Sequence, residues 1–447
     1  MRTNRSSAAG VQHKRLTTMS YSNASLDVRI EALLDAGTCS EFGPSHALRS
    51  ARAARGCIAG RPVWIAGTDA SRSRGAIGVA EASLLCDVFV AARAEAAPLC
   101  LLVDSGGAKV DEGLAALGAF RRLFREALLT RLAGVPMFAL LGRSCFGGAS
   151  MLATLCNARL YSERTLLGAS GPAVIQALAG RDQLDAGDAT AVRALMGGEA
   201  RAALGGDEIL CADELQAFRD RAQKLMSVTT PHQVNIRAQH ERLAQRLSAE
   251  GATPPSDEAI GRMRQLAPSG YRCTARGAVV RAMAADPRGG PAFIGVLSGA
   301  SIGAATSWML ADELIDLHVA RPGTPVILLL DATGQAATRR DEQLLLSAYI
   351  THFALTAAWV AARNHRILLW IPGQAAGAVY VAFAAPAESV SALPSAQLRI
   401  LPHAAAAQIV RNAPMQSTDA DTWIRTGVVD ALLDSRLGSY AGASESR

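Results

Sequence analysis

The sequence predicts an α/β protein in which one β/α domain occurs twice in tandem. Three short, mostly Gly-rich segments of the first half have counterparts in the second half, in the same order and at similar spacing. The matched segments are 75–78 with 300–303, 101–107 with 328–335, and 144–149 with 374–378. Any one match could arise by chance, but three in one order indicate a duplicated fold.

Apolar, strand-like runs alternate with periodic, helix-like segments in both halves, which is typical of β/α units. The expected strands are 60–66, 99–103 and 136–141 in the first half, and 292–297, 326–330, 366–371 and 397–401 in the second. The expected helices are one between Ser25 and Gly37, then 78–96, 112–132, 147–157, one starting near Asp213, and 303–319, 340–364 and 377–386.

Four consecutive segments are expected along the 447 residues, a length that supports two or three buried cores. Residues 1–20 are polar and basic without a period, so we expect a disordered tail. Residues 21–230 form the first domain and 269–440 the second. Between them, 231–268 is charged and periodic and is interpreted as an exposed helical linker.

Composition limits the classes of partner. The formal net charge is +6, and no run of arginines with interleaved aromatic residues occurs, so nucleic acid is not expected as a partner. A modest positive charge suits an acidic partner or a phosphate-bearing cofactor, although on charge alone a well-solvated surface is the better explanation.

Cysteine and histidine spacing argues against a metal centre. The eight cysteines are scattered without a CxxC pair, and the eight histidines show no HxxxH or HExxH spacing. The N-terminus carries no secretory apolar region, so a cytoplasmic location is expected.

Residues 367–387 are uncharged over a length that could span a membrane. They nevertheless contain Pro372, Gly373 and Gly377, and their first-half counterpart contains Arg143. We therefore interpret this stretch as a buried strand, a Gly loop and a buried helix, and expect no membrane association.

The repeated Gly loops stand where a strand ends and a helix is about to begin. Segments 104–108 and 145–148 would aim backbone N–H groups at one point, and such donors bind anions and stabilise a developing oxyanion. Ordinary tight turns are the alternative explanation for any single loop. Since each half carries such loops, we expect one active site built from both halves.

No nucleophile or base is evident. Cys145 precedes a Gly pair, but nothing in the sequence places a histidine beside it. Asp111–Glu112 and Asp341–Glu342 open helices at matching places and are explained by the helix dipole, with acid–base work as the minor alternative. Lys109 flanks the first Gly loop and would suit a phosphate or carboxylate contact, or plain solvent exposure.

Several motifs resemble those of the carboxyltransferase family, which has a crotonase-type (ClpP/crotonase superfamily) fold. Residues 105–113 (SGGAKVDEG) resemble its SGGARxQEG stretch, and the helix from Arg29 to Asp35 resembles its usual lead-in. The Gly pair after Phe146 and residues 168–175 (GASGPAVI) are similar to later motifs of that family.

The second half narrows the resemblance to biotin-independent malonate decarboxylase. Segments 328–335, 339–342 and 349–352 (YITH) resemble its γ subunit, as do 392–396 and 401–402, and the first half to about residue 228 resembles its β subunit. The chain is thus similar to a fusion of β and γ. The resemblance implies removal of CO2 from a malonyl thioester that is carried by an acyl-carrier protein.

The resemblance also implies cofactors and partners. The chain itself would bind no cofactor and no biotin, because the thioester arm is a phosphopantetheine-type group derived from dephospho-CoA on the carrier protein. An acyl-carrier-protein transferase subunit of a decarboxylase complex is the second expected partner, and homo-oligomerisation stays open.

These expectations assign residues. The predicted catalytic residues are Gly107, Gly147 and Gly148 in the first half and Gly334, Gln335 and Gly377 in the second. The predicted substrate-binding residues are Ser105, Gly106, Lys109, Cys145, Phe146, Gly171 and Ala378. The second-half loop departs from the family in having Ala376 and Ala378 around one glycine.

Two other functions stay open at this stage. One is a carboxyltransferase that moves the carboxyl group to or from biotin, and the other is a non-catalytic subunit that binds a carrier protein. An enoyl-thioester hydratase is disfavoured, because neither half places a pair of glutamates beside the Gly loops.

Overall fold

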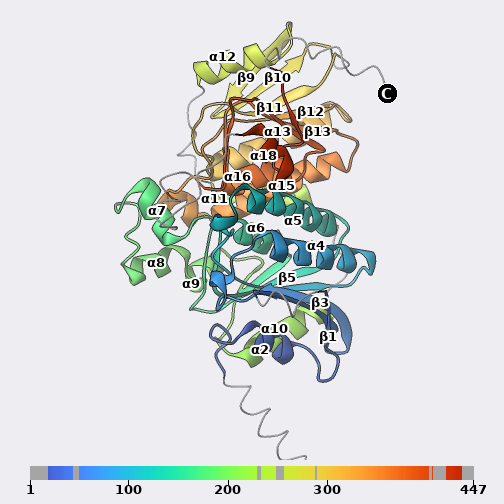
Figure 1. Cartoon of the computed structure of the whole chain (residues 1–447), viewed down its shortest axis with the longest axis vertical. Coiled ribbons are helices and arrows are strands. Elements are labelled where there is room, and N and C mark those ends of the chain that lie inside the picture. Colours follow the sequence, from blue (N-terminus) through green and yellow to red (C-terminus); the bar gives the residue numbers. More distant parts are fainter. Residues whose placement is uncertain are drawn as a thin grey trace, which may run out of the picture. The chain divides into compact units, whose positions relative to one another are not determined.

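The computed structural model describes residues 19–43, 50–228, 233–247, 256–286, 289–401, 405 and 419–434. The expected N-terminal tail falls almost entirely outside these residues. The chain forms two compact units (Figure 1). The first comprises 1–108, 129–172 and 184–234, and the second comprises 109–128, 173–183 and 235–447.

A mostly parallel sheet forms the centre of the first unit. Its strand order is β1-β2-β3-β4-β5-β6-β8, with β7 paired to the end of β5. The pairs β1–β2 and β2–β3 are antiparallel and the others are parallel. The strands are β1 (Ser40–Glu41), β2 (Ala51–Ile58), β3 (Arg61–Thr68), β4 (Leu99–Ser105), β5 (Met137–Phe146), β6 (Ala158–Tyr161), β7 (Leu166–Gly168) and β8 (Glu208–Leu210).

Successive side chains of these strands point to opposite faces of the sheet, and helices cover both faces. Cys100 and Leu102 of β4 pack toward α2 (Leu26–Leu33) and α10 (Leu215–Val228). Leu101 and Val103 point to the other face, where α4 (Val79–Ala94) and α6 (Gly148–Leu155) lie (Figure 1). A strand covered on both faces reads as a continuous apolar run, as β4 does.

Other helices of the first half are shorter or are shared between the units. They are η1 (Ser73–Gly75), η2 (Val110–Glu112), α5 (Leu114–Leu132), α7 (Pro172–Ala179), α8 (Ala189–Met196) and α9 (Gly198–Ala202). Most of α5 and α7 belongs to the second unit.

The second unit repeats the arrangement. Its sheet has the order β17-β15-β13-β12-β11-β10-β9, antiparallel at β9–β10 and β10–β11 and parallel elsewhere. The strands are β9 (Tyr271–Arg276), β10 (Val279–Ala284), β11 (Ala292–Val296), β12 (Val326–Leu330), β13 (Ile367–Ile371), β15 (Ser389–Ala392) and β17 (Ala431–Leu432), with β14 (Gln374–Ala376) and β16 (Gln397–Arg399) as a separate parallel pair.

Helices cover this second sheet as well. Ala259 and Met263 of α12 (Asp257–Leu266) pack on Phe293, Ile327 and Leu329 of the sheet. The remaining helices are α11 (Ile236–Arg246), α13 (Ala304–Ala320), α14 (Arg339–Gln343), α15 (Leu346–Ala361), α16 (Gly377–Ala384) and α18 (Ala420–Arg425). The predicted class, two β/α domains of one fold in tandem, is confirmed.

Two sequence predictions are wrong in detail. The single helix expected at 340–364 is two helices, because Leu345 adopts φ +63° and breaks the run between α14 and α15. The segment 231–268 is not simply exposed, since α11 buries Ile236, His240 and Leu243, and α12 buries Ala259 and Met263. Their charged residues cover only the outer faces of amphipathic helices.

The apolar stretch 367–387 forms β13, β14 and all of α16, which agrees with the predicted strand, Gly loop and buried helix. Among the described residues, no helix has the length and apolar character needed to cross a membrane.

Candidate active site

The first Gly loop begins where β4 ends at the buried Ser105. The carbonyl of Gly107 accepts the N–H of Ile77 at 2.9 Å, and its own N–H donates to Oγ of Ser105 at 3.1 Å. The N–H of Gly106 donates to the carbonyl of Arg74 at 2.8 Å. The Gly107 amide can therefore reach a ligand only if the Ser105 hydroxyl releases it.

The second Gly loop lies beside the first. Ser105 and Cys145 are register partners in the parallel pair β4–β5, so the two strands end together. A Cβ built on Gly147 would lie 3.7 Å from the Cα of Gly107. The structure therefore brings Gly107, Gly147 and Gly148 together, although their catalytic role stays a prediction.

The backbone conformation at position 147 favours glycine. Its φ of +59° lies in the left-handed region, and it turns the chain from β5 into α6. Helix α6 begins at Gly148, so the N–H groups of its first turn include donors that no preceding helical carbonyl can accept. Such amides are the donors that an oxyanion site needs.

A buried carboxylate anchors both first-half loops. Oδ2 of Asp104 pairs with the guanidinium of Arg29 at 2.9 Å, and Oδ1 accepts the N–H of Ser144 at 3.1 Å. Any side chain on Gly142 would collide with this carboxylate. Asp104 thus ties the end of β4 to the last residues of β5, which lead into Gly147.

The second unit contains the same anchor. Oδ1 of Asp331 accepts the N–H of Gln374 at 2.7 Å, its Oδ2 pairs with Arg262, and Gly373 leaves room for it. Both aspartates lie in the repeated segments 101–107 and 328–335, for which no role of an aspartate was predicted. Their matched position after an apolar strand was the available signal.

The second-half residues also come together. The carbonyl of Gly334 accepts the N–H of Ile302 at 2.9 Å, as Gly107 does from Ile77. Gly377 has φ +57°, like Gly147, and a Cβ on it would lie only 3.0 Å from Oε1 of the buried Gln335. Ala378 follows at the position that Gly148 holds in the first unit, and it is buried.

Cys145 is placed as a packing residue. Its side chain is fully buried, and burial, followed by the nearby Asp104 carboxylate, raises the pKa of the thiol well above its ordinary value. A protonated thiol is a poor nucleophile, which agrees with the minor role that the sequence gave it. Only its backbone remains suited to substrate binding.

Two further predicted residues lie against each other. A Cβ built on Gly171 would lie 3.7 Å from Cδ2 of Phe146, so the aromatic ring packs on the turn before α7. Substrate contact by either residue stays a prediction.

The charged residues after the first Gly loop are engaged locally. Nζ of Lys109 lies 3.5 Å from Oε1 of Glu112, and Asp111 belongs to η2, which precedes α5 rather than opening it. In the second unit, Asp341 caps helices, because its Oδ1 accepts the N–H of Ala304 at 2.7 Å. This supports the helix-dipole interpretation for Asp341.

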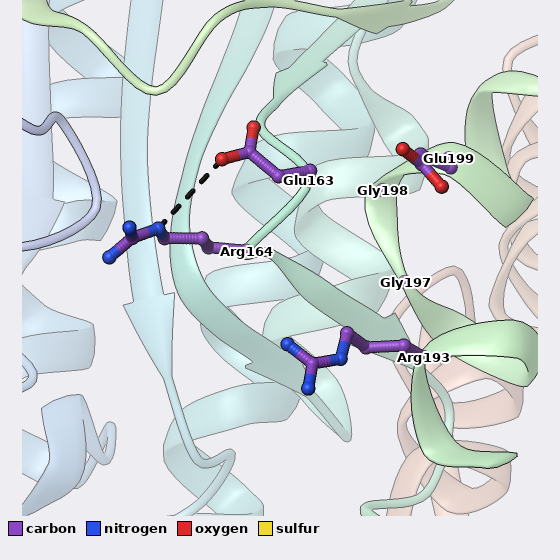
Figure 2. A pocket seen from close by; sticks show the side chains of 6 residues that line it. All are labelled: Glu163, Arg164, Arg193, Gly197, Gly198 and Glu199. Atoms are coloured by element: carbon purple, nitrogen blue, oxygen red, sulfur yellow. Dashed lines mark ion pairs between the residues drawn. The ribbon is translucent and has the colours of Figure 1, made fainter. Parts of the chain in front are cut away.

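A polar pocket of about 510 Å³ lies in the first unit, away from the predicted residues. Figure 2 shows its lining from the turn between β6 and β7 and from the junction of α8 and α9. The lining residues are Glu163, Arg164, Arg193, Gly197, Gly198 and Glu199. Gly197 bridges to Leu166 of β7, which is the strand beside the end of β5.

Among the residues that the structure describes, no group of three or more His, Cys, Asp or Glu side chains could hold a metal ion. The first-unit Gly loops offer backbone N–H donors at the start of α6 beside the buried Asp104–Arg29 pair.

Comparison with protein families gives two matches. Residues 28–259 match the family described as "Carboxyl transferase domain", and residues 297–435 match "Malonate decarboxylase gamma subunit". One polypeptide therefore contains a carboxyl transferase domain, followed by a region that is similar to malonate decarboxylase γ subunits.

Curated relatives match part of the chain. The 12S subunit of methylmalonyl-CoA carboxyltransferase from Propionibacterium freudenreichii subsp. shermanii is 29% identical over 39% of this chain and 32% of its own length. A malonyl-S-ACP:biotin-protein carboxyltransferase of Malonomonas rubra is 31% identical over 26% of this chain and 37% of its own length. An acetyl-coenzyme A carboxylase carboxyl transferase subunit β of Salinibacter ruber is 33% identical over 32% of this chain and 50% of its own length. The aligned region thus spans a third to a half of these relatives.

Solved structures resemble the chain distantly. A Pseudomonas malonate decarboxylase hetero-tetramer in complex with malonate shares 24% identity at a TM-score of 0.46, covering 55% of this chain and 96% of that one. A transcarboxylase 12S structure covers 97% of this chain and 93% of that one, with 17% identity and a TM-score of 0.40.

Proposed function

Because the chain belongs to the carboxyl transferase domain family, we propose that it removes CO2 from a malonyl thioester and leaves an acetyl thioester. The observation that carries this proposal is the γ-type malonate decarboxylase match at 297–435 in the same chain as the carboxyl transferase domain. The curated relative that acts on malonyl-S-ACP supports the same substrate class.

The proposed reaction needs little more than oxyanion donors. The bond between the methylene and carboxylate carbons breaks, CO2 leaves, and the electron pair moves onto the thioester oxygen as an enolate. The methylene carbon then takes a proton from water. Backbone N–H groups at Gly147 and Gly148 are suited to stabilise that oxygen, and those at Gly377 and Ala378 repeat the arrangement.

We further propose that the thioester sits on the phosphopantetheine-type arm of an acyl-carrier protein, loaded by a transferase subunit. No step above requires biotin or a metal ion, since the negative charge is held by amides.

The test is turnover without biotin. The purified chain, treated with avidin, is incubated with malonyl-carrier protein or malonyl-CoA, while CO2 release and the acetyl product are measured by mass spectrometry. Stoichiometric CO2 and acetyl thioester are expected. Absence of both, with carrier binding intact, would indicate a non-catalytic binding subunit instead.

The second candidate is carboxyl transfer to biotin, which the Malonomonas rubra relative favours. In that case the malonyl thioester is consumed only when a biotin protein is added, and carboxybiotin appears before CO2. Running both incubations side by side separates the two functions.

A further inference from the structure

A short basic segment between β3 and α4 lies against the first Gly loop. The N–H of Arg72 donates to the carbonyl of Asp69 at 3.0 Å, and the N–H of Gly75 donates to that of Arg72 at 2.8 Å. Gly75 is pressed on the end of β4, because any side chain there would collide with the carbonyl of Asp104. The segment is therefore fixed relative to β4.

The backbone of this segment is held in an uncommon conformation. Ser73 and Arg74 have φ values of +45° and +54°, in the left-handed region that residues other than glycine seldom adopt. The conformation places the Arg74 carbonyl 2.8 Å from the N–H of Gly106. The Cβ of Arg74 lies 3.7 Å from where a Cβ on Gly106 would stand.

Arg74 thus starts beside Gly106, and Arg72 lies two residues before it in the same anchored segment. Both Arg72 and Arg74 are exposed, and neither side chain forms an ion pair or hydrogen bond with a residue that the structure describes. The one carboxylate of the segment, Asp69, accepts the N–H of Ser71 at 2.9 Å. The segment presents a local positive charge next to Gly106.

We propose that Arg72 and Arg74 bind the carboxylate of the malonyl group and so select a dicarboxylic acyl thioester over a monocarboxylic one. This inference rests on the proposed function. One methylene separates that carboxylate from the carbonyl that the Gly loop would hold, so it lies within reach of a side chain that starts beside Gly106. A phosphate stands at the far end of the pantetheine arm and fits this position less well.

The contact has a kinetic signature. The guanidinium groups act on the carboxylate before CO2 leaves, so they stabilise the bound substrate at least as much as the transition state. Their removal therefore weakens binding without lowering the maximal rate. Because both arginines are exposed, each contributes modestly and is screened by salt.

The test uses the double variant Arg72→Gln/Arg74→Gln with malonyl-CoA as the probe. We expect KM to rise about five- to tenfold with kcat not reduced, and inhibition by acetyl-CoA to change less than twofold. The double lysine variant should stay within about twofold of the wild type, since it keeps the charge. Arg193→Gln, an exposed arginine at the other pocket, is the matched control.

Each other outcome overturns the inference. If the variant binds acetyl-CoA as much more weakly as malonyl-CoA, the arginines contact the pantetheine arm or the nucleotide and not the malonyl carboxylate. If kcat falls at constant KM, their role is purely structural. Loss only in Arg193→Gln would move recognition to the pocket. The proposed function itself fails only if the wild type turns over neither malonyl-CoA nor malonyl-carrier protein. Equilibrium binding of malonyl-CoA against acetyl-CoA then still tests the arginines.

Discussion

At the scale of single residues, the buried pair of Arg29 and Asp104 fixes the ends of two strands. Arg29 also donates to the carbonyls of Tyr21 and Ser22, both at 2.9 Å. Its counterpart in the second unit, Arg262, leaves about a third of its side chain exposed. Loss of Arg29 would leave Asp104 as a buried, unpaired charge, which costs far more free energy than loss of the partly exposed Arg262.

Arg29→Met should therefore lower the free energy of unfolding by roughly 3–5 kcal/mol, because Asp104 is left buried without its partner. Denaturant titration of the first unit, followed by hydrogen exchange in β4, measures the loss. Arg366→Met is the control. Its pair with Glu388 is mostly exposed, so a change under about 1 kcal/mol is expected. Equal effects would show that burial of the first pair is unimportant.

Gly147 and Gly148 differ in what they tolerate. Gly147→Ala places a side chain in the left-handed region, so we expect a stability loss of about 1–2 kcal/mol and at least a tenfold fall in decarboxylation. Gly148→Ala should fold normally and keep turnover, since alanine retains the N–H and Ala378 already holds the matching position. Thermal unfolding and CO2 release check both. A tolerant Gly147→Ala would argue against the oxyanion assignment.

At the scale of elements, three buried or half-buried side chains tie α11 to its neighbours. Nδ1 of His240 lies 3.1 Å from Nε2 of His352 on α15, and its Nε2 lies 3.1 Å from Oδ1 of Asp312 on α13. Arg276 of β9 pairs with the other oxygen of Asp312. The Nδ1 of His352 makes no hydrogen bond with a described residue.

This arrangement predicts a pH-dependent stability. Burial, assisted by the charges of His240 and Arg242, lowers the pKa of His352 to about 3. In the unfolded chain His352 takes a proton below about pH 6.5, whereas the folded chain resists until about pH 3. The second unit should therefore lose about 1 kcal/mol for each pH unit below about 6, an effect that His352→Gln reduces.

Denaturation midpoints at pH 7, 6 and 5 measure this slope. Thr356→Val, one turn further along α15, is the control, because its buried hydroxyl also makes no hydrogen bond with a described residue. That variant should keep the wild-type slope and unfold no more easily. The same slope in His352→Gln would place the titration elsewhere.

Sequence patterns predicted the elements that carry the Gly loops and missed several others. β4, β12 and β13 are short, mostly apolar runs with a glycine or proline directly before or after them, a pattern that predicts buried strands. β2 is composed mainly of alanine and arginine, residues with little strand preference, and was missed although it lies inside the sheet. The helix break at Leu345 could not be predicted, because no glycine or proline lies beside it in the sequence.

At the scale of the whole molecule, the compact units do not follow the order of the chain. Residues 109–128 precede much of the first sheet in sequence yet belong to the second unit. Arg121 donates to both carboxylate oxygens of Asp430, at 3.0 and 2.6 Å, and to the carbonyl of Gly427 at 3.1 Å. Local periodicity cannot reveal pairings over such separations, so the sequence predicted consecutive domains. A site shared by both halves remains a prediction.

The pairing of Arg121 with Asp430 makes the grouping testable in the intact protein. Asp430→Asn removes the charge-assisted contact that holds the Arg121 side chain. Amide hydrogen exchange across 114–128 should then rise severalfold, while exchange in α10 of the first unit stays unchanged. Glu95→Gln, which disrupts an exposed pair with Arg55 in the first unit, should leave both segments unaffected. If exchange across 114–128 is unchanged in Asp430→Asn, other contacts hold this helix. The pairing with Asp430, some three hundred residues away in sequence, would then have no part in ordering it.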